Sequence, residues 1–194
     1  MKQKIGIIGR KTVGKAIQAG VQRAGYETRM VGRGGGLAET AAWADLLVLA
    51  VPFDARQAVA AEIGSAADGK PVVDATNALT KEATLAIGFV TSGAEQLQAW
   101  LPKARVVKAF NTVFASCMPS GTVKGSPVFM PVASDDAGAR QAVIALCRDV
   151  GFDAVDAGPL VNARLLEPMA VLLVQLGYVT NGGMGTDIGF TLVR

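Results

Sequence analysis

Apolar residues follow two alternating patterns along this chain, and the amino-terminal segment shows both. Residues 4–9 form a short apolar run, rich in β-branched side chains, that ends in glycine, as is typical of a buried parallel strand. Residues 13–25 repeat apolar side chains at helical spacing and end at Gly25, a residue type that commonly terminates helices. The chain is therefore predicted to begin with a strand, a glycine-containing turn and a helix.

The same alternation continues to residue 156. Apolar runs predict strands at residues 27–32, 44–52, 71–74, 105–110, 128–133 and 153–156. Helical spacing predicts helices at residues 37–43, 54–63, 93–101 and 137–150, with caps at Asp54 for the second and at Ser134-Asp135-Asp136 for the last. This regular alternation predicts an α/β fold with a Rossmann-type, doubly wound parallel sheet covered by helices on both faces.

The pattern changes from residue 160. Residues 162–178 form one long apolar helical segment interrupted by Pro168, too apolar to present a single exposed face. It must pack against the sheet domain, a partner chain or both, and an oligomer interface is favoured. The glycine-rich residues 182–190 either fold over a planar ligand or form a simple tail. We therefore expect a domain at residues 1–158 and a small carboxyl-terminal helical extension at 159–194.

Composition narrows the classes of function. With 51% hydrophobic and 18% charged residues the chain is globular rather than disordered. Its net charge of +3 comes without a lysine-arginine run, so no nucleic-acid partner is expected. The absence of histidine removes the commonest metal ligand and the commonest general base, and the spacing of Cys117 and Cys147 suggests neither a bridge nor a metal site.

The termini and the hydropathy pattern bear on localisation. Met1 leads directly into the first strand, which leaves no room for a signal peptide. No run of about eighteen uninterrupted apolar residues occurs, so no membrane span is expected. These features predict a soluble, cytoplasmic protein.

The turn after the first strand resembles an incomplete dinucleotide fingerprint. A complete G-x-G-x-x-G would place glycines at positions 9, 11 and 14, whereas the chain has Gly9, Lys11 and Gly14. In one interpretation Lys11, with Arg10 and Thr12, turns outward and adds charge and a hydroxyl to a phosphate cradle at the helix amino terminus. In the other the loop binds nucleotide weakly or not at all. Later features favour binding.

The residues at the end of the second predicted strand indicate which dinucleotide the protein would bind. In a doubly wound sheet this position meets the adenosine ribose, where an acidic residue accepts hydrogen bonds from a free 2′-hydroxyl. Here Gly32-Arg33 ends the strand and no carboxylate follows until Glu39. A guanidinium suits a 2′-phosphate, so NADP is favoured over NAD. The alternative is an ordinary loop arginine beside a mobile Gly34-Gly35-Gly36 turn.

Two further strand ends are candidates to line a cofactor. Carboxyl ends of parallel strands point to the ligand crevice of such a sheet, which selects Val51-Pro52 and Thr76-Asn77. The alternative is that Pro52 and Asn77 merely terminate strands.

Several blocks together resemble one family. The runs KIGIIG, VGKA, LAVP, VVDATN, ARVVKAFNT, DAGPLVNARLLEPMA and GMGTDIGF are similar to the NADPH-dependent deazaflavin-coenzyme reductases, also called coenzyme F-420-dependent NADP oxidoreductases. The resemblance covers residues 4–194, and its two longest blocks are far more specific than the glycine turn. It departs from the family at Lys11, which replaces the usual second glycine, and after Arg33, where GGG stands in place of a helix.

The resemblance implies an NADP-binding Rossmann domain, a small helical portion and a homodimer, here through the carboxyl-terminal helices. It implies phosphate binding at the glycine turn, 2′-phosphate binding at the second strand end, and nicotinamide and acceptor rings near three later strand ends. The expected cofactor-binding residues are Gly9, Arg10, Lys11, Thr12, Val13, Gly14, Gly32, Arg33, Ala50, Val51, Pro52, Thr76, Asn77, Ala109, Phe110 and Asn111.

The lack of acid and base side chains fits hydride transfer between two ring carriers, which needs alignment and water exclusion rather than a proton donor. Lys70, Lys103 and Lys108 are possible donors but are more typical of surface or strand-edge lysines. No catalytic side chain and no metal is therefore expected. The predicted function is an NADP(H)-dependent oxidoreductase with a deazaflavin or flavin-type acceptor. The alternatives are reduction of a small carbonyl, imine or ferric chelate, and NADP binding without catalysis.

Overall fold

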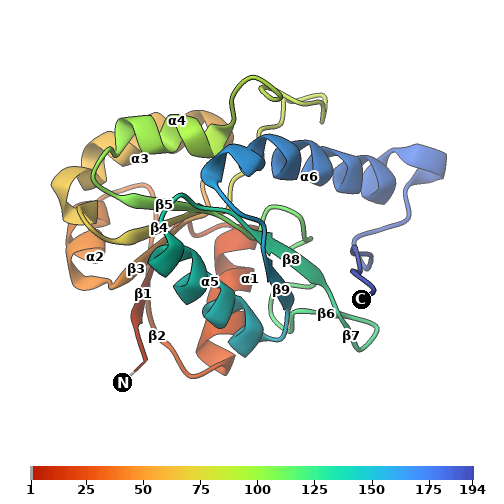
Figure 1. The fold of residues 1–194 in the computed structure, drawn as a ribbon, viewed down its shortest axis with the longest axis horizontal. Coiled ribbons are helices and arrows are strands. Elements are labelled where there is room, and N and C mark those ends of the chain that lie inside the picture. Colours follow the sequence, from red (N-terminus) through yellow and green to blue (C-terminus); the bar gives the residue numbers. More distant parts are fainter. Residues whose placement is uncertain (1) are drawn as a thin grey trace.

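The computed structural model describes residues 2–194 and is built on one five-stranded parallel sheet (Figure 1). The strand order is β2-β1-β3-β4-β5. The strands are β1 (Lys4–Ile8), β2 (Glu27–Val31), β3 (Leu46–Leu49), β4 (Pro71–Asp74) and β5 (Arg105–Lys108). β3 is buried at every position, which explains its uninterrupted apolar sequence, because a central parallel strand is covered on both faces.

Helices cover both faces of this sheet (Figure 1). On one face α1 (Thr12–Arg23) and α5 (Ala137–Val150) enclose a core that contains Ile17, Val48 and Val143. On the other, α2 (Leu37–Trp43), α3 (Arg56–Ile63) and α4 (Gly93–Trp100) enclose a second core with Leu47 and Leu97. The predicted α/β, Rossmann-type fold class is therefore confirmed.

A second pair of parallel strands extends the sheet region beyond β5. β8 (Phe129–Val132) pairs with β9 (Asp153–Asp156), and Ala133 exchanges two backbone hydrogen bonds with Lys108 at the end of β5. The sequence did not predict the hairpin of β6 (Thr122–Val123) and β7 (Ser126–Pro127), whose two-residue strands are too short to show a hydrophobic period. Four short 3₁₀ turns complete the elements: η1 (Phe53–Ala55), η2 (Gly64–Ala67), η3 (Leu160–Asn162) and η4 (Thr180–Gly182).

Local capping was predicted correctly at one helix and wrongly at another. Asp136 caps α5, because its side chain accepts a hydrogen bond from the Ala139 backbone N–H at 2.7 Å. Asp54 caps nothing, since it lies inside η1 and α3 begins only at Arg56. After β3 the chain forms a 3₁₀ turn from Phe53 before the α-helix begins. The apolar spacing of residues 54–63 does not distinguish this 3₁₀ turn from the first turn of an α-helix.

The long carboxyl-terminal helix α6 (Ala163–Tyr178) packs across the carboxyl edge of the sheet beside α4 (Figure 1). The 19-residue segment Leu160–Tyr178 is long and apolar enough, by length and composition, to cross a membrane. It also contains Arg164, whose guanidinium pairs with Glu95 at 2.7 Å, and the fully buried Glu167. These polar contacts fasten the helix to the rest of the protein. The expectations of no membrane span and of a domain division at 158/159 both stay predictions.

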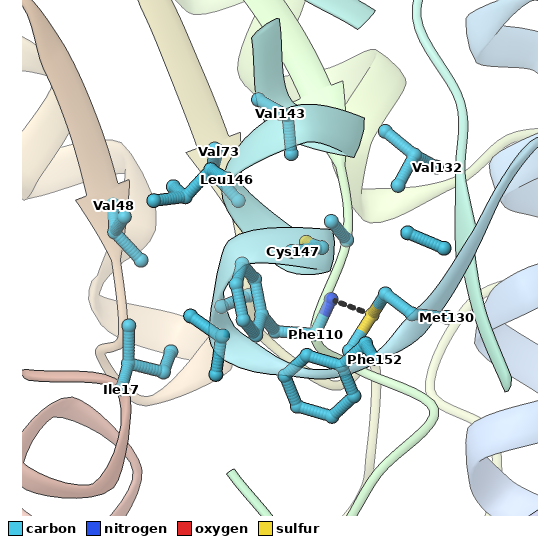
Figure 2. Close-up of a cluster of buried hydrophobic side chains, with 14 of the residues drawn as sticks. Ile17, Val48, Val73, Phe110, Met130, Val132, Val143, Leu146, Cys147 and Phe152 are labelled. Atoms are coloured by element: carbon cyan, nitrogen blue, oxygen red, sulfur yellow. Dashed lines mark hydrogen bonds between the residues drawn. The ribbon is translucent and has the colours of Figure 1, made fainter. Parts of the chain in front are cut away.

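The core beneath α5 contains an unusual backbone contact (Figure 2). Phe110 has a φ angle of 64°, in the left-handed region that bulky side chains seldom adopt. Its buried N–H donates to the sulfur of Met130 at 3.1 Å, and its ring packs edge-on against Phe152 with centroids 5.9 Å apart. The thioether is thus the partner that satisfies a main-chain donor in an otherwise apolar core.

We expect Met130→Leu to lower the free energy of unfolding by about 1–3 kcal/mol, because it leaves the Phe110 N–H buried without an acceptor. Met118→Leu is the matched control, since Met118 lies in the same core and no hydrogen bond to its sulfur is present among residues 2–194. Urea unfolding measures both variants. Equal losses would show that shape, not the hydrogen bond, sets the cost at Met130.

Candidate functional site

The strand order creates a crevice between two neighbouring strands. From β1 the chain continues outward to β2, whereas β3 continues in the opposite direction to β4, so connections diverge between β1 and β3. Ligands of open α/β sheets bind at the carboxyl ends of strands at such a point. A cavity of about 550 Å³ lies there, lined by Ile8, Gly9, Arg10, Lys11, Gly32, Arg33, Gly34, Leu37, Ala50, Val51, Pro52, Ala55, Ala58, Val59 and Glu62.

Two glycines of the turn after β1 are required by packing. Gly9 has a φ of 128°, and a Cβ atom there would collide with the carbonyl oxygen of Ala50 at the end of β3. A Cβ at Gly14 would collide with the carbonyl oxygen of Gly9, so the first turn of α1 can sit directly against the turn. These are the roles that the first and third glycines of a dinucleotide fingerprint serve.

Lys11 occupies the middle position without backbone strain. It precedes α1 with φ −89° and ψ −167°, an extended conformation open to any residue. Its exposed side chain contributes to the cavity lining. Thr12 and Val13 open the 12-residue helix α1, whose first N–H groups have no partner within the helix. The departure from the fingerprint therefore leaves the turn intact and adds a cation beside a helix amino terminus.

Three of the residues that line the cavity are cationic. Arg10, Lys11 and Arg33 all line it, and Glu62 is the one carboxylate among its lining residues. The Arg10 side chain runs directly beside Gly32, because a Cβ built at Gly32 would lie 2.9 Å from Arg10 Nε and 3.2 Å from its Cγ. The absence of a side chain at residue 32 thus lets one arginine approach the strand end that carries the other.

The structure separates the predicted binding residues into two groups. Those that line the cavity are Gly9, Arg10, Lys11, Gly32, Arg33, Ala50, Val51 and Pro52. Those outside its lining are Thr12, Val13, Gly14, Thr76, Asn77, Ala109, Phe110 and Asn111. Sequence reasoning missed the contribution of η1 and α3, although Ala55, Ala58, Val59 and Glu62 recur at helical spacing after a strand end.

The residues after β4 and β5 hold polar atoms without partners. Among residues 2–194, Asn77 Oδ1, Asn111 Oδ1 and Thr112 Oγ1 are buried and make no hydrogen bond. The amide of Asn111 is fixed in orientation, since its Nδ2 donates to the Leu166 carbonyl of α6 at 2.8 Å. Orphaned buried acceptors are uncommon in native proteins, and here they follow two adjacent strand ends. Thr112 was not predicted, because its hydroxyl gives no pattern in sequence.

Ala109 and Phe110 contribute their side chains to the hydrophobic core instead of to a ligand surface. Both are at most 1% exposed. The Phe110 ring lies against Phe152 among the side chains drawn in Figure 2. The Phe110 ring is thus part of the core, and the expectation that Ala109 and Phe110 bind a cofactor stays a prediction.

Lys108, expected at the surface or at a strand edge, is completely buried in an ion network. Its Nζ donates to Asp74 Oδ2 at 3.1 Å, to the Thr76 carbonyl at 2.7 Å and pairs with Glu167 Oε1 at 3.2 Å. Glu167 also accepts the backbone N–H groups of Gly93 and Ala94 at the start of α4. This network joins the ends of β4 and β5 to α4 and α6.

The charge state of Asp74 follows from its neighbours. Burial by itself would raise the pKa of this fully enclosed carboxyl. The attraction of Lys108 and the hydrogen bonds from the Thr76 hydroxyl and N–H outweigh that effect and hold the pKa of Asp74 below its ordinary value. Asp74 is therefore ionised at neutral pH, and its contribution to stability is lost only as the pH falls through the lowered folded-state pKa.

A second buried cation lies close by on α3. Arg56 donates to the carbonyls of Phe53 and Gly93 at 2.9 Å and 2.6 Å, and its guanidinium carbon lies 3.7 Å from the centre of the Phe53 ring. Burial lowers the pKa of Arg56, while Asp74 and Glu167 oppose that shift. Two buried carboxylates thus face two buried cations. Residues 2–194 contain no cluster of His, Cys, Asp or Glu suited to a metal ion, and the expected absence of a metal stays a prediction.

Comparison with known proteins identifies relatives by sequence and by structure. No family model matches the chain. Over 182 residues it is 31% identical to the F420-dependent NADP reductase of Methanothermobacter marburgensis, which covers 88% of this chain and 80% of that protein. It is 32% identical over 106 residues to the metalloreductase STEAP3 of Rattus norvegicus, but spans only 21% of that protein's length. A solved structure of a putative F420-dependent NADP-reductase from Arthrobacter sp. FB24 is similar with a TM-score of 0.90, at 26% identity over 100% of both chains.

We expect Lys108→Met to destabilise the protein by roughly 3–5 kcal/mol, because it leaves Asp74 and Glu167 buried without their shared cation. Arg105→Met, at the other end of β5, is the control. Its ion pair with Asp136 is 3.4 Å long and half exposed, so its loss should cost at most about 1 kcal/mol. Urea unfolding compares the two.

A further variant covers the case in which Lys108→Met does not fold. Lys108→Met combined with Glu167→Gln removes one of the two uncompensated charges, so it should be more stable than Lys108→Met alone. No recovery in the double variant, or equal costs at Lys108 and Arg105, would contradict the network.

Proposed function

This chain belongs to the family of F420-dependent NADP reductases, and from that membership we propose that it transfers hydride between NADPH and a deazaflavin or flavin-type acceptor. It is an NADP-dependent oxidoreductase, with NADP(H) as its cofactor. The observation on the molecule itself that carries the proposal is the cation-lined cavity at the carboxyl ends of β1 and β3. The acceptor is the finer part of the proposal.

The cavity suits a ligand with several phosphates. The diphosphate binds over the glycine turn, where free N–H groups of α1 and the Lys11 ammonium offer donors and positive charge. The 2′-phosphate binds at the end of β2, where Arg33 and the adjacent Arg10 provide planar guanidinium groups. Two arginines at this position favour a phosphorylated ribose over a free one.

The rings are assigned to the ends of β4 and β5. The fixed acceptor oxygen of Asn111, together with Asn77, suits a planar ring that carries an amide, such as nicotinamide. The nearby Lys108 is held in the buried network by two hydrogen bonds and an ion pair, so it cannot supply a proton without breaking that network. Such a site can align two rings and exclude water, which is sufficient for hydride transfer between carriers.

We further infer a cytoplasmic homodimer that forms through α6. Leu165, Leu172 and Val179 are spaced seven residues apart along this helix and its end, and each is more than half exposed. Large exposed apolar side chains in a stripe mark a protein interface more often than a free surface. Both cysteines are free and buried, as expected of a protein from a reducing compartment. The division into residues 1–158 and 159–194 accompanies this proposal.

We expect Arg33→Ala to weaken NADPH binding by about 1.5–3 kcal/mol, the scale of a lost hydrogen bond to a charged group, and to leave NADH binding nearly unchanged. Lys103→Ala serves as the control, since this lysine is 78% exposed and lies before the amino end of β5, away from the crevice. Calorimetric titration measures both dinucleotides. An equal loss for NADPH and NADH would refute the 2′-phosphate assignment.

A panel of acceptors tests which compound receives the hydride. NADPH oxidation is followed with a deazaflavin coenzyme, FMN, a ferric chelate and a set of small carbonyls and imines, and we expect turnover with the deazaflavin or FMN. The partial match to a metalloreductase gives ferric chelate reduction a specific basis as the second candidate. Turnover only with carbonyls, imines or chelates would displace the proposed acceptor. Tight NADPH binding without any turnover would favour a non-catalytic NADP-binding protein.

A further inference from the structure

The helix α3 presents one continuous face to the cavity. The residues that line it are Ala58, Val59 and Glu62 of α3 and the preceding residue Ala55, the last of η1, and together they follow the i, i+3, i+4, i+7 spacing of a single helix side. Ala55 is anchored beside the strand end, because its N–H donates to the Pro52 carbonyl at 3.0 Å. Seven residues at 1.5 Å each place Glu62 roughly 10 Å further along the helix. The cavity wall therefore runs from β3 along small and apolar side chains to a carboxylate.

This carboxylate is opposite in charge to the other ionisable side chains that line the cavity. Arg10, Lys11 and Arg33 make the lining cationic, and Glu62 is the single acidic residue in it. Within residues 2–194 no hydrogen bond or ion pair engages the Glu62 side chain. An ionised carboxylate can only accept hydrogen bonds, and it would repel any phosphate placed next to it. Glu62 is exposed to solvent, so a ligand that displaces water from it binds most favourably when it presents a neutral or positive donor there.

The adenine base of a dinucleotide meets this requirement. Its planar ring fits a slot with an apolar wall at Ala58 and Val59 and an arginine at the opposite strand end, where guanidinium groups stack well on aromatic rings. Its exocyclic amine is a pair of N–H donors that extends beyond the ring. This step rests on the proposed function, which sets the diphosphate at the glycine turn.

We propose that Glu62 accepts a hydrogen bond from the exocyclic amine of adenine and thereby selects adenine over a base that carries an oxygen at the same position. The carboxylate then serves recognition of the base, while the three cations serve the phosphates. Hypoxanthine has a carbonyl oxygen in place of the amine and a hydrogen on the adjacent N1, so a carboxylate aimed at the amine position would face a second acceptor there. The site thus discriminates by both an attraction and a repulsion.

The test compares NADPH with reduced nicotinamide hypoxanthine dinucleotide phosphate by calorimetric titration. The wild-type protein should bind NADPH roughly ten-fold or more tightly, as expected for a hydrogen bond to a charged group. In Glu62→Ala the preference should fall toward unity. Glu27→Ala is the matched control, because this exposed glutamate begins β2 at the opposite edge of the sheet, and it should keep the wild-type ratio.

The outcomes separate this inference from the proposed function. If the wild-type protein binds neither dinucleotide, the proposed function fails. If it binds both with equal affinity, or if Glu62→Ala keeps the full preference for NADPH, the role of Glu62 is overturned while NADP binding stands. A preference lost in Glu62→Ala and kept in Glu27→Ala supports base recognition by Glu62.

Discussion

The rest of the structure depends on one buried ion pair cluster, in which Lys108 is held between Asp74 and Glu167. Each of these groups would be costly to bury alone, and the cost is offset because the ammonium donates to Asp74 and to the Thr76 carbonyl and forms an ion pair with Glu167. The cluster fixes α6 across the ends of β4 and β5. Through the neighbouring Leu166 carbonyl, that helix also sets the orientation of the Asn111 amide. Stability and site geometry thus share the same contacts.

The phosphate end of the crevice follows a different principle, which is steric. Gly9 and Gly14 are needed because the chain passes close to the main chain of Ala50 and of the turn itself. Lys11 needs no such freedom, so a charged side chain replaces the usual second glycine without disturbing the turn. In the proposed function the phosphate contacts the Lys11 ammonium, whereas a second glycine would let it approach the bare backbone. The Arg10 side chain occupies the space beside Gly32 that a side chain at residue 32 would fill.

These two halves divide the proposed reaction between them. In the proposed function the β1–β3 end binds the dinucleotide through its charged lining, and the β4–β5 end provides fixed, unpaired polar atoms next to a buried network. At the β4–β5 end, the ionisable side chains of Lys108, Asp74 and Glu167 are held in the buried network. In the proposed function the site works by aligning two rings, and the precision of that alignment depends on how firmly α6 is held.

The sequence by itself determined the class of fold, several strand and helix bounds, the α5 cap and the residues of the cavity wall near Gly9, Gly32 and Pro52. These are local features, because hydrophobic period, capping and turn chemistry act over a few residues. Only the tertiary structure decided that Lys108 is buried, that the Phe110 ring belongs to the core, and that Glu62 reaches the cavity. Each of these depends on partners 20 or more residues away or on the direction of a helix face, and a linear pattern carries no record of such contacts.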